Sequence, residues 1–227
     1  MEYGQFCPVA KATEIIGEKW TILIIRELLM GATRFNDFQR GLSLISPTLL
    51  SKRLDSLANR NLIMKKKIPG QKGYEYFPTQ SCKELLPIIV SLGDWGMDWA
   101  RSNLSVKDYD INLLMIYLER SVLPEKLIGN QTIIKFKFTD MEADSEWWLV
   151  VKNGEKDLCN KDPGDEIDVY FTTDVKTMAD IWMGDDTYKS ALRTDRLKLV
   201  GHSSLINSIQ TWLPHCMFAD VPSAQEI

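Results

Sequence analysis

Residues 45–60 read ISPTLLSKRLDSLANR, and this stretch decides how the first half of the chain folds. Ser46 can cap a helix, and Pro47 stands at the first helical position, where its missing N–H loses no hydrogen bond. Three leucines then recur at the three- or four-residue spacing of one helix face: Leu50, Leu54 and Leu57. The stretch therefore predicts an amphipathic helix over residues 47 to about 60.

The outward face of this helix carries short polar and basic side chains: Thr48, Ser51, Lys52, Asp55 and Asn59. When such a helix is the second of a helix-turn-helix, it enters the major groove of DNA and its N-terminal residues contact base edges. Thr48 and Ser51 can exchange hydrogen bonds with bases, and Lys52 can reach guanine acceptors or phosphate. We expect Arg53, at the edge of this face, to contact phosphate. An ordinary amphipathic helix with a solvated face fits the same residues.

The segments around this helix complete a known order. Apolar patterns predict three helices before it, then a hairpin and a long helix after it, over residues 8–16, 19–30, 34–40, 62–77 and 83–100. A winged helix-turn-helix has this same order of elements: two helices, a short helix, a capped helix, a hairpin and a last helix. We therefore expect a mainly α winged helix-turn-helix domain over residues 1–105.

The hairpin is basic. Side chains alternate along a strand, so Lys65 and Lys67 share one face and Lys66 lies on the other. With Lys72 in the turn, this charge can follow a phosphate backbone and position the protein without reading sequence. Lysines that keep an edge strand from aggregating are the alternative interpretation.

The charge is divided unevenly along the chain. Of the 227 residues, 1–101 carry 14 Lys and Arg against 10 Asp and Glu, whereas 102–227 carry 13 against 21, for a net charge of −4. From Arg34 to Lys83 there are 10 basic and 3 acidic residues. The asymmetry favours a polyanion such as double-stranded DNA as the partner of the first half. An uneven solvated surface is the other interpretation.

Several short segments of the first half follow one another in a family's order: Cys7-Pro8-Val9, Gly17-Glu18-Lys19-Trp20, Arg26-Glu27-Leu28-Leu29 with Gly31, Arg34-Phe35-Asn36-Asp37-Phe38, residues 45–54, Glu75-Tyr76, and Trp95-Gly96 with Trp99. Together they resemble the HxlR-type winged-helix regulators of bacteria and archaea, over residues 7–100. The resemblance implies DNA binding as a homodimer, with the N-terminal segment and the helix near 85–99 forming the dimer contact. The tip from Gly70 to Lys72 departs from the family's commoner proline-bearing hairpin.

The candidate DNA contacts are Arg34, Ser46, Thr48, Ser51, Lys52, Arg53, Lys65, Lys67 and Lys72. Cys7 is a further candidate, because in some regulators of this type a cysteine at this position senses oxidants or electrophiles. Lys11 lies four residues on and could favour the reactive thiolate. A small apolar residue packed at the dimer contact is the interpretation that we favour for Cys7.

Residues 106–227 predict a mixed α+β domain. Strands at 132–138, 147–152, 167–172 and 197–200 accompany helices at 111–120, 177–183, 188–192 and 204–213. The segments 168–174, 181–184, 197–201 and 212–213 resemble the sterol-carrier-protein-2-like (SCP2-like) fold, in which a curved sheet and helices enclose an apolar tunnel. The resemblance implies an apolar small-molecule ligand, with Trp147, Trp182 and Trp212 as candidate wall residues. Simple core packing is the interpretation that we favour for each single tryptophan.

Motifs for catalysis, cofactors and metals are missing. The sequence has no GxSxG, GxGxxG or P-loop, and its 4 cysteines and 2 histidines lack metal-ligand spacing. We therefore expect no enzyme activity, no cofactor and no metal. The apolar runs are too short to span a bilayer and no signal peptide is visible, so we expect a cytoplasmic protein without a membrane partner.

These features predict a transcriptional regulator. Its homodimer would present the helix at 47–60 to palindromic promoter DNA, and an apolar effector in the second half could modulate binding if its affinity differed between two states. The competing interpretation is a lipid or small-molecule carrier whose first half only dimerises. The basic excess between Arg34 and Lys83 discriminates between them, because a carrier does not need it.

Overall fold

The chain divides into two compact units. The computed structural model describes residues 2–222, and the division between the units falls between Trp95 and Gly96. The sequence predicted domains of 1–105 and 106–227. The division by contacts lies earlier, within the helix α6 (Leu86–Trp99), which continues across it.

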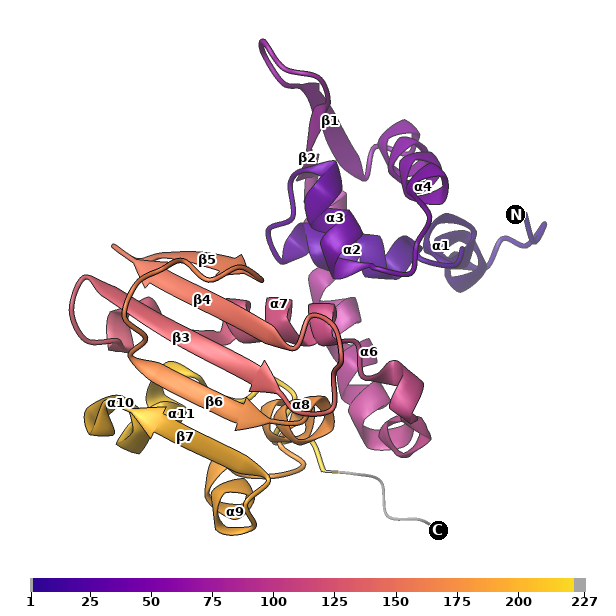
Figure 1. Ribbon diagram of the computed structural model, residues 1–227. Helices are drawn as coiled ribbons and strands as arrows, with labels where there is room; N and C mark the ends of the chain where they lie inside the picture. The colour runs from indigo at the N-terminus through magenta and orange to yellow at the C-terminus, as the bar shows by residue number, and fades with distance from the viewer. Residues whose placement is uncertain (1, 223–227) are drawn as a thin grey trace. The chain divides into compact units, whose positions relative to one another are not determined.

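The first unit is a winged helix-turn-helix. Four helices come first, followed by a two-stranded antiparallel hairpin and two further helices: α1 (Pro8–Ile16), α2 (Thr21–Leu29), α3 (Phe35–Gly41), α4 (Pro47–Asn59), β1 (Ile63–Lys67), β2 (Tyr74–Pro78), α5 (Gln80–Lys83) and α6 (Leu86–Trp99). This confirms the order of elements that the sequence predicted. The hairpin, which forms the wing, projects beyond the helices of its own unit (Figure 1).

The start of α4 and its buried face follow from local sequence. The Ser46 Oγ accepts a hydrogen bond from the Leu49 backbone N–H at 3.3 Å, and Pro47 occupies the first helical turn. The leucines of the apolar face are buried in a core shared with α2 and α3: Leu50, Leu54 and Leu57. Burial of each such side chain contributes about 1.5–3 kcal/mol.

Two predicted helix bounds in the first unit need correction. The helix predicted at 83–100 begins at Leu86 and ends at Trp99, and a separate short helix that was not predicted, α5, precedes it and ends at Lys83. Pro87 explains the break, since a proline inside a continuous helix would lose a hydrogen bond and clash with the preceding turn. The helix predicted from residue 19 begins at Thr21, because Trp20 adopts a left-handed conformation with φ of 78°.

The second unit is a mixed sheet with helices. Its elements are η1 (Arg101–Asn103), η2 (Val106–Asp108), α7 (Ile111–Ser121), η3 (Pro124–Lys126), β3 (Gln131–Phe138), β4 (Glu146–Lys152), β5 (Glu155–Cys159), β6 (Val169–Thr173), α8 (Val175–Met183), α9 (Tyr188–Arg193), β7 (Leu197–Gly201), α10 (Ser203–Asn207) and α11 (Ile209–Trp212). The five-stranded sheet has the order β5-β4-β3-β6-β7. The neighbours β3 and β6 are parallel, and the other pairs are antiparallel.

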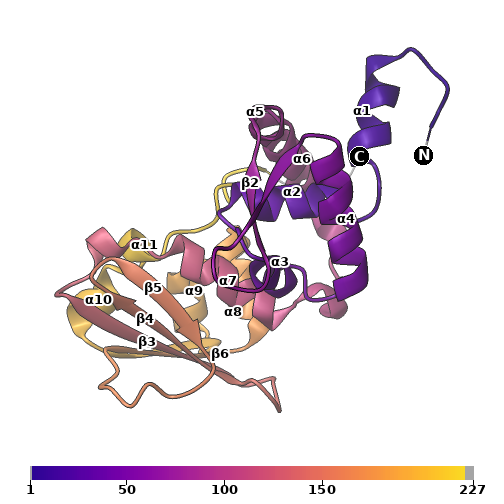
Figure 2. The ribbon, with the colours of Figure 1, turned by 90° about the horizontal axis from the view of Figure 1, so that it is seen from above.

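The helices gather on one face of this sheet (Figure 2). Alternate residues of the central strands, such as Phe136 on β3 and Phe171 on β6, are fully buried against α7, α8 and α11. Their rings stack with centroids 4.6 Å apart. The sheet and helices agree with the α+β class predicted for this half. The predicted helix at 204–213 is two short helices, α10 and α11, and the predicted strands omitted β5.

Within residues 2–222, no helix combines the length and the apolar character needed to cross a bilayer.

A buried carboxylate of α2 packs against α3 in the first unit. Glu27 is completely buried, and its Oε1 accepts a charge-assisted hydrogen bond from Arg26 at 2.8 Å. Its other carboxylate oxygen lies over Gly41, where a methyl group in place of the glycine hydrogen would come within 2.3 Å of Oε2. The glycine at the end of α3 is therefore required by the close approach of a side chain that cannot move into solvent.

We expect Gly41→Ala to lower the free energy of unfolding of the first unit by roughly 1–3 kcal/mol, because the added methyl overpacks this contact. Urea unfolding followed by circular dichroism measures the change. Asn36→Ala, on the exposed side of the same helix, is the matched control and should change stability by less than about 0.5 kcal/mol. Equal stability of the two variants would contradict the packing assigned to Gly41.

Candidate nucleic-acid interface

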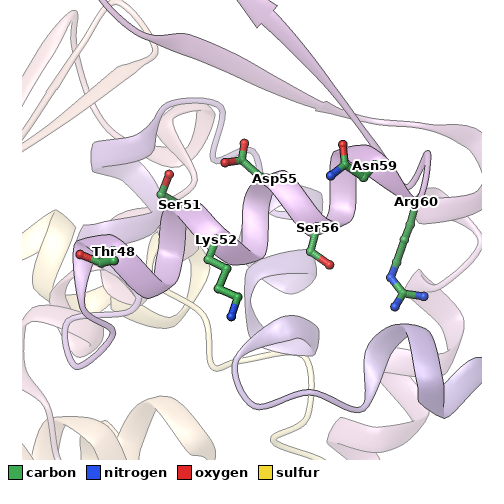
Figure 3. A pocket seen from close by; sticks show the side chains of 7 residues that line it. All are labelled: Thr48, Ser51, Lys52, Asp55, Ser56, Asn59 and Arg60. Carbon is green, nitrogen blue, oxygen red and sulfur yellow. The ribbon is translucent and has the colours of Figure 1, made fainter. Parts of the chain in front are cut away.

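The outward face of α4 lines an open groove of about 680 Å³. The side chains that line it are polar or charged and come from this one helix: Thr48, Ser51, Lys52, Asp55, Ser56, Asn59 and Arg60 (Figure 3). The structure thus brings together three residues predicted to contact bases, namely Thr48, Ser51 and Lys52. All three are exposed.

Four lining residues were absent from the predicted contacts: Asp55, Ser56, Asn59 and Arg60. Their spacing was the available signal, because residues four and eight positions beyond Ser51 and Lys52 continue the same helix face. The predicted contact Ser46 lies at the N-terminus of α4, where its hydroxyl oxygen already accepts the capping hydrogen bond. Ser46 remains exposed and could still donate its own proton.

The lysines of the wing do not share one role. Lys65 donates to Asp55 of α4 at 2.7 Å, and its Nζ lies 4.1 Å from the centre of the Tyr74 ring. Lys66, on the opposite face, lies over Phe77. Lys67 and Lys72 are exposed and have no ion-pair partner within residues 2–222. Of the wing cations, Lys67 and Lys72 are therefore the ones most available to a polyanion.

Arg34 contacts the second strand and the tip of the wing. It precedes α3, and its backbone forms an isolated antiparallel bridge with Glu75 of β2. Its guanidinium also contacts the Glu75 carboxylate at 3.3 Å and the Gln71 side chain at 3.4 Å. About half of the Arg34 side chain is exposed, so its predicted DNA contact stays a prediction.

Arg53 is held inside its own unit. Its guanidinium forms an ion pair with Glu18, and its Nε donates to the Lys19 backbone oxygen at 3.1 Å. Only 15% of the side chain is exposed. In this structure Arg53 fastens α4 to the segment between α1 and α2, which differs from the phosphate contact that the helix spacing suggested. The sequence carried no signal for this pairing, because the partners lie far apart along the chain.

The four thiols differ in environment. Cys7 is partly exposed and stands directly before α1. Burial raises the pKa of the Cys82 thiol to about 11 and also raises the pKa values of the Cys159 and Cys216 thiols. These three are poor thiolates near neutral pH. The role of Cys7 as a sensor stays a prediction.

The three candidate wall residues of the second unit have protein partners. The indole N–H of Trp147 donates to the Asp144 backbone oxygen, and that of Trp212 donates to the Leu205 backbone oxygen, both at 2.8 Å. Trp182 donates to the Ser121 hydroxyl and stacks on Tyr117, with ring centroids 4.8 Å apart. Trp147 and Trp212 belong to the buried core. A tunnel lined by these residues stays a prediction.

Two segments of the chain match known protein families. Residues 15–104 match the HxlR-like helix-turn-helix family, and residues 117–214 match the SCP-2 sterol transfer family. The first match covers the helices α2 to α4, the wing and α6. The second covers the five-stranded sheet, the helices α8 to α11 and the end of α7.

Two curated relatives align with the first half of the chain. The uncharacterized HTH-type transcriptional regulator YvaP of Bacillus subtilis (strain 168) is 32% identical over 101 residues, which are 44% of this chain and 94% of YvaP. The uncharacterized HTH-type transcriptional regulator MT3179 of Mycobacterium tuberculosis (strain CDC 1551 / Oshkosh) is 36% identical over 94 residues, which are 40% of this chain and 58% of the relative.

A solved structure of a MarR-family transcriptional regulator from Porphyromonas gingivalis W83 is 34% identical and covers 41% of this chain and 92% of its own, with a TM-score of 0.39. The sequence relation to YvaP extends over nearly the whole of that protein. This chain therefore belongs to the HxlR-like helix-turn-helix family of transcriptional regulators, and it carries a second unit that matches the SCP-2 sterol transfer family.

Proposed function

We propose that this protein binds palindromic promoter DNA as a homodimer, with α4 in the major groove and the wing along the phosphate backbone. The observation that carries the proposal is the outward face of α4, which is exposed, polar and built from side chains that can pair with base edges. A helix face that was only solvated would not need a basic hairpin beside it.

The expected contacts fall into two classes. Thr48, Ser51 and Lys52 lie near the N-terminal end of α4, from which base edges are read. Lys67 and Lys72 of the wing are suited to phosphate, because their cations are exposed and not paired with carboxylates within residues 2–222. Base contacts then supply specificity, and the wing supplies affinity that depends on salt.

The homodimer is supported by an apolar helix face that its own unit leaves uncovered. Ile88, Leu92 and Trp95 lie on one side of α6 and are 56%, 48% and 58% exposed. The neighbouring side of the helix packs on the core through Ile89. On α1, Val9 is 72% exposed. Large apolar side chains exposed together on a helix are typical of an interface, and a second copy of the chain would bury them.

We expect Leu92→Glu to convert a dimer into a monomer at micromolar concentrations, because a carboxylate would be buried against a second copy without a partner. Sedimentation velocity measures the mass. Asp94→Lys changes a charge on the polar side of the same helix and should leave the dimer intact. A wild-type chain that sediments as a monomer, or a dimer unaffected by the glutamate, would contradict the assignment of this face.

We expect Lys52→Ala to weaken DNA binding by roughly 3- to 10-fold and to reduce the salt slope by about 1 if Lys52 contacts phosphate. Fluorescence anisotropy with a duplex from the region upstream of the protein's own gene, and with a scrambled duplex, measures both. Lys107→Ala removes an exposed lysine of the second unit and is the control. Arg53→Ala would be a poor test, since it breaks the ion pair with Glu18.

Binding that prefers the native duplex and falls steeply with salt supports the regulator. If no duplex binds at low salt, the carrier whose first half only dimerises becomes the better proposal.

The second unit is proposed to bind an apolar effector, as its match to the SCP-2 sterol transfer family suggests. The helix α8, which contributes Met178 and Ile181 to the core of this unit, is connected to the segment that follows α6. In that segment, the Tyr109 hydroxyl donates to Asp180 of α8 at 3.4 Å, and Arg101 pairs with Asp185 just after α8. A ligand that displaced α8 would therefore also displace the segment that follows α6, because these two contacts join them.

We expect oleate or dehydroergosterol to change the affinity for the upstream duplex by roughly 5-fold or more, because allosteric coupling free energies are typically 1–3 kcal/mol. The same anisotropy titration, with and without the lipid, measures the change. Arg101→Gln should reduce it by loosening the attachment at Asp185. Lipid binding with no change in DNA affinity in either protein would contradict the effector role.

A further inference from the structure

Asp55 is an acidic residue in the middle of the face of α4 that is proposed to read DNA. It lies one turn beyond Ser51 and one turn before Asn59, with its carboxyl group on the same side of the helix as both (Figure 3). Half of its side chain, 51%, is exposed. A carboxylate at this place would be repelled by nearby phosphates unless another charge compensates it.

Lys65 provides that compensation from the wing. Its Nζ lies 2.7 Å from Oδ1 of Asp55, and the hydrogen bond to Asp55 raises the pKa of Lys65. The Tyr74 ring also contacts this ammonium group, with the ring centre 4.1 Å from the same Nζ. The ammonium group is therefore fixed beside the carboxylate, and it stays charged throughout the neutral range.

The ion pair uses only one of the two carboxylate oxygens. Within residues 2–222, Oδ2 of Asp55 has no hydrogen-bond partner, and the carboxyl group faces the groove along α4. An ionised carboxylate only accepts hydrogen bonds. In the major groove it is repelled by guanine O6 and N7 and by thymine O4, and it is attracted by the exocyclic amino groups.

Cytosine is the base that suits such an acceptor. Its N4 amino group donates and has no acceptor beside it on the same base, whereas the N6 amino group of adenine lies next to the N7 acceptor. We propose that Asp55 is a specificity-determining residue, which selects cytosine at one position of each half-site while Lys65 neutralises its charge. The inference rests on the proposed function, because it assigns a base to the same helix face.

The test is selection of bound sequences from a pool of randomised duplexes, with the full-length wild type, Asp55→Asn and Lys65→Gln. For the wild type we expect one position in each half-site at which cytosine is favoured by about 5- to 100-fold. In Asp55→Asn the preference at this position should change from cytosine towards adenine, because an amide pairs with adenine N6 and N7. The other positions should stay unchanged.

Lys65→Gln separates base reading from the attachment of the wing. It breaks the same ion pair as Asp55→Asn, but it keeps the carboxylate. We expect it to weaken binding to all sequences while cytosine remains favoured at the same position. Thermal unfolding of both variants, followed by circular dichroism, shows whether the first unit stays folded.

The possible outcomes are distinct. If Asp55→Asn keeps the wild-type sequence preference at every position, or if both variants change the preference in the same way, Asp55 only anchors the wing and the inference is wrong. If the wild type enriches no sequence and binds no duplex, the proposed function itself fails. A cytosine preference that is lost only in Asp55→Asn supports the inference.

Discussion

Burial of one face of α4 is the constraint on which the rest of the first unit depends. Leu50 and Leu54 are completely buried and Leu57 is 1% exposed. Because successive residues turn by about 100° around a helix axis, a rotation of α4 by one position would bring a leucine into solvent and a polar side chain into the core. The leucines therefore determine which side chains α4 presents, and the composition of that face is a consequence of core packing.

The cations of the first unit fall into two groups, those that pair with a carboxylate of the same unit and those that do not. Some cations are paired with carboxylates of their own unit, among them Arg34, Arg53 and Lys65. Others are exposed without such a partner within residues 2–222, among them Lys52, Lys67 and Lys72. Screening limits electrostatic interactions in solution to about 10 Å at 0.1 M salt. A chain with a net charge of −4 can therefore attract a polyanion locally, because distant acidic residues contribute little.

Sequence patterns within single helices and strands predicted most of the fold. The site was harder to predict, because some of its side chains pair with residues far away in the sequence. Ser46 and Pro47 fixed the start of α4, as expected. The role of Arg53 was not predictable, because Glu18 is brought to it only by the folded unit. The strand β5 was omitted although Asn153 and Gly154 were a usable signal. Both have positive φ, 52° and 83°, as a two-residue hairpin turn between β4 and β5 requires.

The ion pair between Asp55 and Lys65 has a mechanical consequence as well as an electrostatic one. It joins the helix proposed to read bases to the hairpin proposed to contact phosphate, across residues that are ten positions apart in sequence. Because Arg34 also holds the hairpin through Glu75, the wing is attached to both α3 and α4. A wing held at two points cannot adjust to the phosphates independently of the reading helix. In the proposed complex, contacts to the DNA backbone would therefore set the register in which α4 meets the bases, and nonspecific attraction and specific reading would be coupled.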